Sequence, residues 1–84
     1  MTIEKEVLGI LDAVLCLRGR ASSFQADTLL LGAVPELDSM AVLGIITSIE
    51  ERFGFTIHDD EIDGAVFATL GSLVHFVQAK LAAP

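Results

Sequence analysis

Hydrophobic residues recur at helical spacing in three stretches of the chain, and each stretch starts beside a residue that can cap a helix. In the first stretch, residues 3–17, Thr2 is placed as the cap, and Glu4 and Glu6 are favourable near the positive end of the helix. The apolar stripe here consists of Ile3, Val7, Ile10, Leu11, Val14 and Leu17. The pattern predicts a helix that ends at Arg18-Gly19-Arg20.

The second stretch, residues 39–53, follows Pro35 and Asp38 and stops at Gly54. Proline favours a loop ahead of the helix, aspartate is a good N-cap, and glycine commonly ends a helix. One buried stripe is expected to contain Met40, Leu43, Ile46, Ile49 and Phe53, which leaves Val42, Gly44 and Ile45 for the other faces. This stretch therefore predicts a second, unusually apolar helix.

The third stretch begins at Thr69, the third candidate cap, and predicts a last helix through about Leu81. Its apolar positions are Leu70, Leu73, Val74, Val77 and Leu81. Residues 59–64 predict a short helical turn. Residues 21–37 predict a long loop, and the side chains expected to anchor it to the core are Phe24, Leu29, Leu30 and Leu31. Residues 55–57 are too short to predict a strand, and strand signals are otherwise missing. The sequence thus predicts one all-α domain over residues 1–84, a small four-helix bundle with a long first loop and a short third helix.

Composition adds few constraints to this picture. Hydrophobic residues make up 52% of the 84-residue chain, enough to fill one small core. No apolar run is long enough to span a membrane, and the polar, acidic start does not resemble a secretory signal, so we expect a cytoplasmic protein. The single cysteine, Cys16, excludes an internal disulfide and is expected to be an inert packing residue among Val14, Leu15 and Leu17.

The negative charge is concentrated in one segment. Between residues 36 and 63 lie Arg52 and eight acids: Glu36, Asp38, Glu50, Glu51, Asp59, Asp60, Glu61 and Asp63. This segment carries the whole formal net charge of −7. Such a surface repels nucleic acid and anionic membranes and attracts enzymes with basic docking faces, unless it serves only solubility. We expect Glu50, Glu51 and Ile62, which lies within the acidic run, to contact partner proteins.

Ser39 is the residue with the most suggestive position. In the first turn of the second helix it lies beside unpaired N–H groups and the positive end of the helix dipole, where a phosphate is well tolerated. A catalytic role is not expected, because the Gly-x-Ser-x-Gly elbow is absent and only His58 and His75 could act as an imidazole base. A dedicated metal site is not expected either. When residues 59–64 are aligned with an EF-hand loop, Leu70 falls where the bidentate glutamate belongs.

The segment Asp38-Ser39-Met40 resembles the Asp-Ser-Leu attachment motif of acyl carrier proteins. The similarity extends to residues 27–32 in the first loop, 49–55 at the end of the second helix, and 67–70 before the last helix. The resemblance implies a 4′-phosphopantetheine group on Ser39, transferred from coenzyme A by a phosphopantetheinyl transferase, with Asp38 and Met40 as the flanks of the motif. It also implies a monomeric carrier without catalysis of its own, which serves acyl-loading, condensing and acyl-transfer enzymes.

One departure from the family changes the expected docking surface. Fatty-acid carriers usually bear acids just after the modified serine, whereas this chain has Ala41, Val42, Leu43 and Gly44. Docking near Ser39 should therefore be more apolar. Because the buried stripe does not require every large residue, we expect Leu43 to be an exposed partner contact. Gly44 and Gly71 could leave room for an acyl chain between the helices.

The pathway and the carrier class remain open at this point. A specialised pathway, such as polyketide, modified-lipid or exported-polymer synthesis, is favoured over central fatty-acid synthesis. The first alternative is an aminoacyl or peptidyl carrier, which usually has Gly-Gly and His or Asp before the serine, unlike Pro35-Glu36-Leu37-Asp38. The second alternative is a helical interaction domain without modification.

Overall fold

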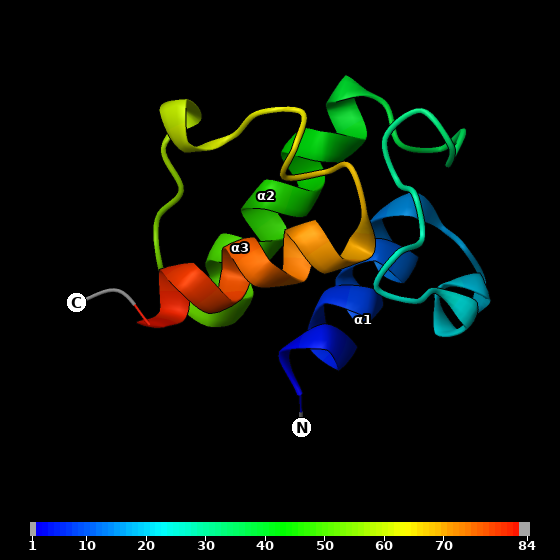
Figure 1. Ribbon diagram of the computed structural model, residues 1–84, viewed down its shortest axis with the longest axis horizontal. Helices are drawn as coiled ribbons and strands as arrows, with labels where there is room; N and C mark the ends of the chain where they lie inside the picture. Colours follow the sequence, from blue (N-terminus) through cyan, green and yellow to red (C-terminus); the bar gives the residue numbers. More distant parts are fainter. Residues whose placement is uncertain (1, 83–84) are drawn as a thin grey trace.

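The computed structural model describes residues 2–82, apart from the side chain of Asp59. It contains three α-helices and two 3₁₀ helices: α1 (Ile3–Leu15), η1 (Arg20–Ser23), α2 (Ser39–Phe53), η2 (Asp59–Glu61) and α3 (Leu70–Ala82) (Figure 1). The described part has no strand, only an isolated bridge between Leu29 and Thr69. The all-α prediction is confirmed, although the expected short third helix is a single 3₁₀ turn. No helix in residues 2–82 is long and apolar enough to cross a membrane.

The first helix ends two residues earlier than expected. Thr2 accepts a hydrogen bond from the Lys5 N–H at 3.2 Å, as expected for the cap. At the other end, Cys16 adopts a left-handed conformation with φ 54° and donates its N–H to Asp12. The Asp12 side chain also accepts from the Gly19 N–H at 2.9 Å. Cys16 is therefore an exposed C-cap, and its expected role as a packing residue is wrong.

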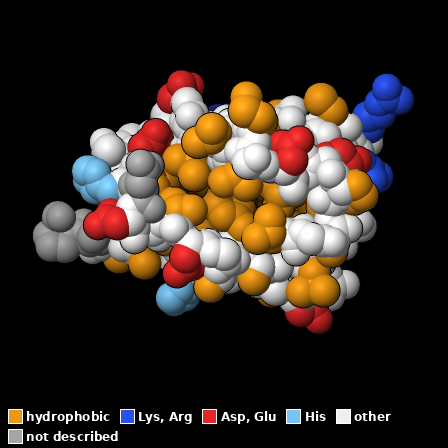
Figure 2. All heavy atoms as spheres, turned by 90° about the horizontal axis from the view of Figure 1, so that it is seen from above, with side chains coloured by type: hydrophobic (Ala, Val, Ile, Leu, Met, Phe, Trp, Pro, Cys, Tyr) orange, Lys and Arg blue, Asp and Glu red, His pale blue; other side chains and the backbone are white. Residues whose placement is uncertain are grey.

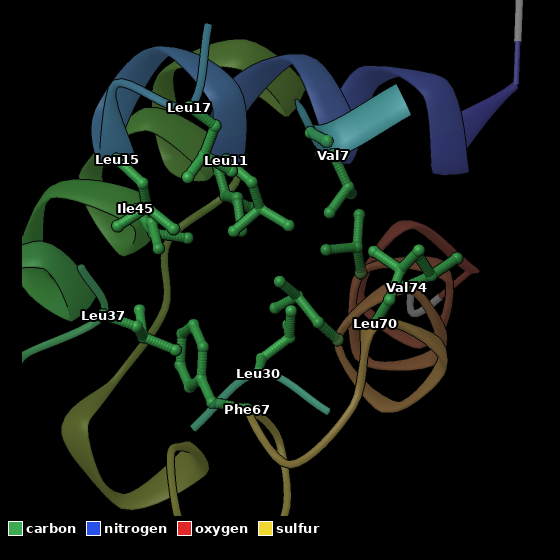
Figure 3. Packing of buried hydrophobic residues seen from close by; sticks show 14 of the residues in the cluster. Val7, Leu11, Leu15, Leu17, Leu30, Leu37, Ile45, Phe67, Leu70 and Val74 are labelled. Atoms are coloured by element: carbon green, nitrogen blue, oxygen red, sulfur yellow. The ribbon is translucent and has the colours of Figure 1, made fainter. Parts of the chain in front are cut away.

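The predicted helical phase of α2 is also wrong. Ile45 is fully buried, whereas Met40 and Leu43 are 75% and 60% exposed. A Cβ on Gly44 would lie 3.2 Å from Val14 Cγ1, so the Gly44 side of α2 is the side that packs against α1. The close-up of the core shows Ile45 between Leu15, Leu11 and Leu37 (Figure 3). Because α2 is apolar on several faces, its sequence fits more than one buried stripe, and packing against α1 selects among them.

The long first loop is held by backbone hydrogen bonds to the segment that precedes α3. Four bonds of 2.8 to 3.0 Å connect the two segments: Leu30 N–H donates to Ala68 O, Leu31 N–H to Phe67 O, Leu70 N–H to Thr28 O and Gly71 N–H to Ala26 O. Leu30 is fully buried, but Leu29 and Leu31 are 61% and 48% exposed. Of the three leucines expected to anchor the loop to the core, only Leu30 does so. The hydrogen bonds to residues 67–71 leave the side chains of Leu29 and Leu31 facing outward. Phe24 is half-buried and packs against the core, whereas Leu81 of the expected α3 stripe is exposed.

Candidate functional site

Ser39 is the first residue of α2 and is exposed. The helix begins in the upper part of the view in Figure 1. Asp38 precedes it in extended conformation, and its carboxylate accepts a hydrogen bond from the Ala41 N–H at 2.8 Å. The cap fixes where the helix starts and therefore where the Ser39 hydroxyl lies. In this position Ser39 is next to the positive end of the α2 dipole, which favours a negatively charged group on its oxygen.

The chain reaches this helix start through a buried anchor and an ion pair. Leu37 is 6% exposed, and its N–H donates to Val34 O at 3.0 Å. The Glu36 carboxylate pairs with the Arg20 guanidinium of η1, and hydrogen bonding to that group lowers the pKa of Glu36. These contacts attach the loop before Ser39 to the core and to η1, while Ser39 itself stays accessible.

The surface next to Ser39 is apolar. Met40 and Leu43 from α2, with Leu31 from the first loop, form what we call the apolar rim, and all three are exposed. Seen from above, hydrophobic side chains gather on this face and acidic side chains lie around them (Figure 2). The first turn of α2 contains no acid. The exposure of Leu43 agrees with its expected role as a partner contact and not with its place in the expected buried stripe. The structure adds Met40 and Leu31, which the sequence pattern had also assigned to the core.

An open cavity of about 520 Å³ lies beside Ser39. Its lining residues are Leu31, Asp38, Ser39, Val42, Leu43, Ile46 and Ile62. The cavity brings Ile62, which follows η2, to the same site as Ser39 and Leu43. Gly44 and Gly71 are not part of it: Gly44 faces Val14 and Gly71 faces the Ala26 backbone. The room that these glycines leave is therefore used for close packing of the elements.

Several acids of the segment from residue 36 to residue 63 are engaged in internal contacts. The half-buried Glu50 accepts a hydrogen bond from the Ile57 N–H at 2.7 Å, and Asp63 accepts from the Ala65 N–H at 2.9 Å. Glu61 forms an ion pair with Lys80, and the hydrogen bond from Lys80 lowers the pKa of Glu61. Glu51 is exposed at the far end of α2. The sequence contains no direct signal for the Glu50 contact, because its partner is a backbone group seven residues away.

The other candidate chemistries find no support in the geometry. In the described residues, no group of three or more His, Cys, Asp or Glu side chains is placed to hold a metal ion. His58 lies in the connection before η2 and His75 lies on α3; both are exposed, and neither lines the cavity beside Ser39. The described site therefore offers an accessible hydroxyl at a helix start, an apolar cavity and an apolar rim.

Comparisons with known proteins point to one family. A family model described as a phosphopantetheine attachment site matches residues 36–77, which include Ser39 and every cavity-lining residue except Leu31. The fold is similar to the solution NMR structure of a holo acyl carrier protein from Nitrosomonas europaea, with a TM-score of 0.91. The two sequences are 48% identical, and the match covers 99% of this chain and 100% of that chain. Comparison with curated proteins gives no significant match.

Proposed function

This chain belongs to the acyl carrier protein family, and on that basis we propose that Ser39 bears its 4′-phosphopantetheine and that the arm carries acyl groups between enzymes. Members of the family are carriers without catalytic activity of their own. The observation that carries the assignment of Ser39 is its position: an exposed hydroxyl at the start of α2, within the matched segment and beside an apolar cavity.

The chemistry at Ser39 is a transfer of phosphopantetheine from coenzyme A. A bond forms between Ser39 Oγ and the phosphorus of the pantetheine phosphate, and the pyrophosphate bond of coenzyme A breaks. Adenosine 3′,5′-bisphosphate leaves, and a base of the transferase takes the hydroxyl proton. The part of this chain is to present the hydroxyl: Asp38 fixes the helix start, and the α2 dipole favours the phosphodiester that results.

The residues around Ser39 fit such a group. When bound, it supplies a terminal thiol to which acyl groups are attached as thioesters. Val42, Leu43, Ile46 and Ile62 give the neighbouring cavity an apolar lining on which an acyl chain can lie. Burial contributes roughly 0.8 kcal/mol per methylene, so several buried methylenes would favour the cavity over water by a few kcal/mol.

We expect partner enzymes to dock mainly through the apolar rim. The first partner is the phosphopantetheinyl transferase, followed by acyl-loading, condensing and acyl-transfer enzymes. The absence of acids in the first turn of α2 supports a specialised lipid, polyketide or polymer pathway over central fatty-acid synthesis. In this proposal residues 1–84 act as one monomeric carrier domain in the cytoplasm, alongside coenzyme A-dependent enzymes.

Loading the arm with competing donors tests this function. The protein is first converted with coenzyme A, Mg²⁺ and a broad-specificity transferase, and is then offered acyl donors and aminoacyl donors with their loading enzymes. We expect an acyl group that neutral hydroxylamine releases, as a thioester requires. Loading with aminoacyl groups alone would instead support an aminoacyl or peptidyl carrier. A modified protein that accepts neither donor would contradict the proposal.

A further inference from the structure

One wall of the cavity comes from a segment that is distant from Ser39 in the sequence. This segment has no α-helix. Ile62 lines the cavity directly after η2, a helix of only three residues. Such a segment cannot hold its position through its own backbone hydrogen bonds, because a single turn is not stable in isolation. Ile62 itself packs against the core, and the position of its backbone also depends on the contacts that η2 makes with the rest of the fold.

The Glu61 side chain supplies hydrogen bonds that hold η2 in place. One of its carboxylate oxygens accepts a hydrogen bond from the His58 N–H at 2.8 Å, and the Glu61 N–H donates to His58 O at 3.0 Å. The same carboxylate accepts from Lys80 Nζ at 2.8 and 3.1 Å. Glu61 thus both closes the η2 turn and connects η2 to the last turn of α3.

Lys80 is held in place from its other side. Its ammonium lies 5.7 Å from the centre of the Phe55 ring, and that ring stacks on Phe53 at the end of α2 with 6.2 Å between the ring centres. The side chains of Lys80 and Glu61 are only 21% and 29% exposed. A charge-assisted, bidentate contact at this degree of burial is better ordered than a fully exposed ion pair.

We propose that the Glu61–Lys80 pair is a positioning device for Ile62: by fixing η2 against α3, it holds Ile62 in the wall of the open cavity beside Ser39. This inference rests on the proposed function, because it assigns to the pair a consequence for the acyl group carried on Ser39. The pair determines how completely the cavity covers that group. Loss of the pair loosens this wall and leaves the acyl group and its thioester more exposed to reagents in solution.

Matched variants separate the charge of Lys80 from its other effects. Lys80→Met removes the ammonium but keeps an apolar side chain against Phe55, and Lys80→Arg keeps the ion pair. Lys5→Met, on the exposed side of α1, controls for the loss of one positive charge. Circular dichroism establishes that each variant is folded.

The first measurement uses the unmodified protein and does not depend on the arm. Amide hydrogen exchange of His58 and Glu61, and the methyl resonances of Ile62, report on η2 and the cavity wall. In Lys80→Met we expect exchange at these amides to rise about two- to fivefold, the range that a partly exposed ion pair supports. The Ile62 methyl resonances should also shift, with no such changes in Lys80→Arg or Lys5→Met.

The second measurement uses the acylated form and the rate at which neutral hydroxylamine cleaves the thioester. Lys80→Met should be cleaved about two- to fivefold faster than the wild type, in parallel with the exchange rates. Unchanged exchange in Lys80→Met, or faster exchange with an unchanged cleavage rate, would overturn the inference. Failure of the wild type to acquire the arm would contradict the proposed function instead, and the exchange data would still test the positioning of Ile62.

Discussion

At the scale of single residues, the large apolar side chains of α2 range from fully buried to mostly exposed. Ile45 and Ile49 are buried, whereas Met40 and Leu43 are exposed beside Ser39. An exposed leucine alone needs no explanation, but we expect two large exposed side chains next to the proposed attachment serine to form part of the surface that the transferase covers.

Leu43→Glu tests the role of this surface. Since Leu43 is 60% exposed, we expect the fold to be retained, while the Michaelis constant for the carrier in a transferase assay rises because a charge replaces an apolar contact. Ile45→Ala is the matched change on the buried face and should lower the free energy of unfolding by roughly 2–5 kcal/mol. Unfolding of Leu43→Glu, or unchanged transferase kinetics in the folded variant, would show that Leu43 is not a docking contact.

The neighbouring acids Glu50 and Glu51 are expected to respond differently to substitution. Glu50→Ala leaves the buried Ile57 N–H without its acceptor and should cost roughly 1–3 kcal/mol of stability. Glu51→Lys changes an exposed side chain, so stability should stay within about 0.5 kcal/mol. If Glu51 also steers a basic partner, its reversal should raise the Michaelis constant most at low salt. If chemical denaturation shows equal losses of stability in Glu50→Ala and Glu51→Lys, the structural role assigned to Glu50 alone would be contradicted.

At the scale of elements, helix starts were easier to predict than helix faces. Thr2 and Asp38 cap the helices that follow them, as their side-chain chemistry predicts, and Gly54 ends α2 in a left-handed conformation with φ 77°. The buried face of α2 could not be predicted, because the contact between Gly44 and Val14 decides which side of α2 meets α1. Ile62 was expected from the sequence to contact partners, and only the fold brings it into the wall of the cavity beside Ser39.

Two glycines within helices should show opposite effects when replaced by alanine. A Cβ on Gly9 would meet nothing within 4 Å, so Gly9→Ala should stabilise the protein by roughly 0.5–1 kcal/mol through helix propensity. A Cβ on Gly71 would lie 2.8 Å from Ala26 O, so Gly71→Ala should destabilise it by roughly 1–3 kcal/mol. Thermal unfolding of both variants checks the prediction, and stabilisation by Gly71→Ala would show that the first loop is not packed against α3 as described.

At the scale of the whole molecule, the acidic composition links stability to pH through two ion pairs. Hydrogen bonds from Arg20 and Lys80 lower the pKa of Glu36 and Glu61 from the usual 4.5. A carboxylate whose pKa is lower in the folded state stabilises the fold above its unfolded-state pKa, and this contribution is lost as pH falls through the folded-state value. Both contributions should therefore be complete at neutral pH and disappear in acid.

Lys80→Met isolates the contribution of Glu61. The wild type should melt at a higher temperature than the variant at about pH 7, and the difference should shrink as the pH falls through the lowered pKa of Glu61, because the carboxyl group is then protonated in both folded proteins. A difference in melting temperature that stays constant over this range would mean that Lys80 stabilises the fold by packing alone.

The central claim is that this chain is a carrier modified at Ser39, and intact mass tests it most directly. The wild type, Ser39→Ala and Ser48→Ala are each incubated with coenzyme A, Mg²⁺ and a broad-specificity transferase; Ser48 is a second serine of α2, near the helix's other end. We expect the wild type and Ser48→Ala each to gain the mass of one phosphopantetheine and Ser39→Ala to gain none. An unchanged wild-type mass, or the same gain in Ser39→Ala, would contradict it.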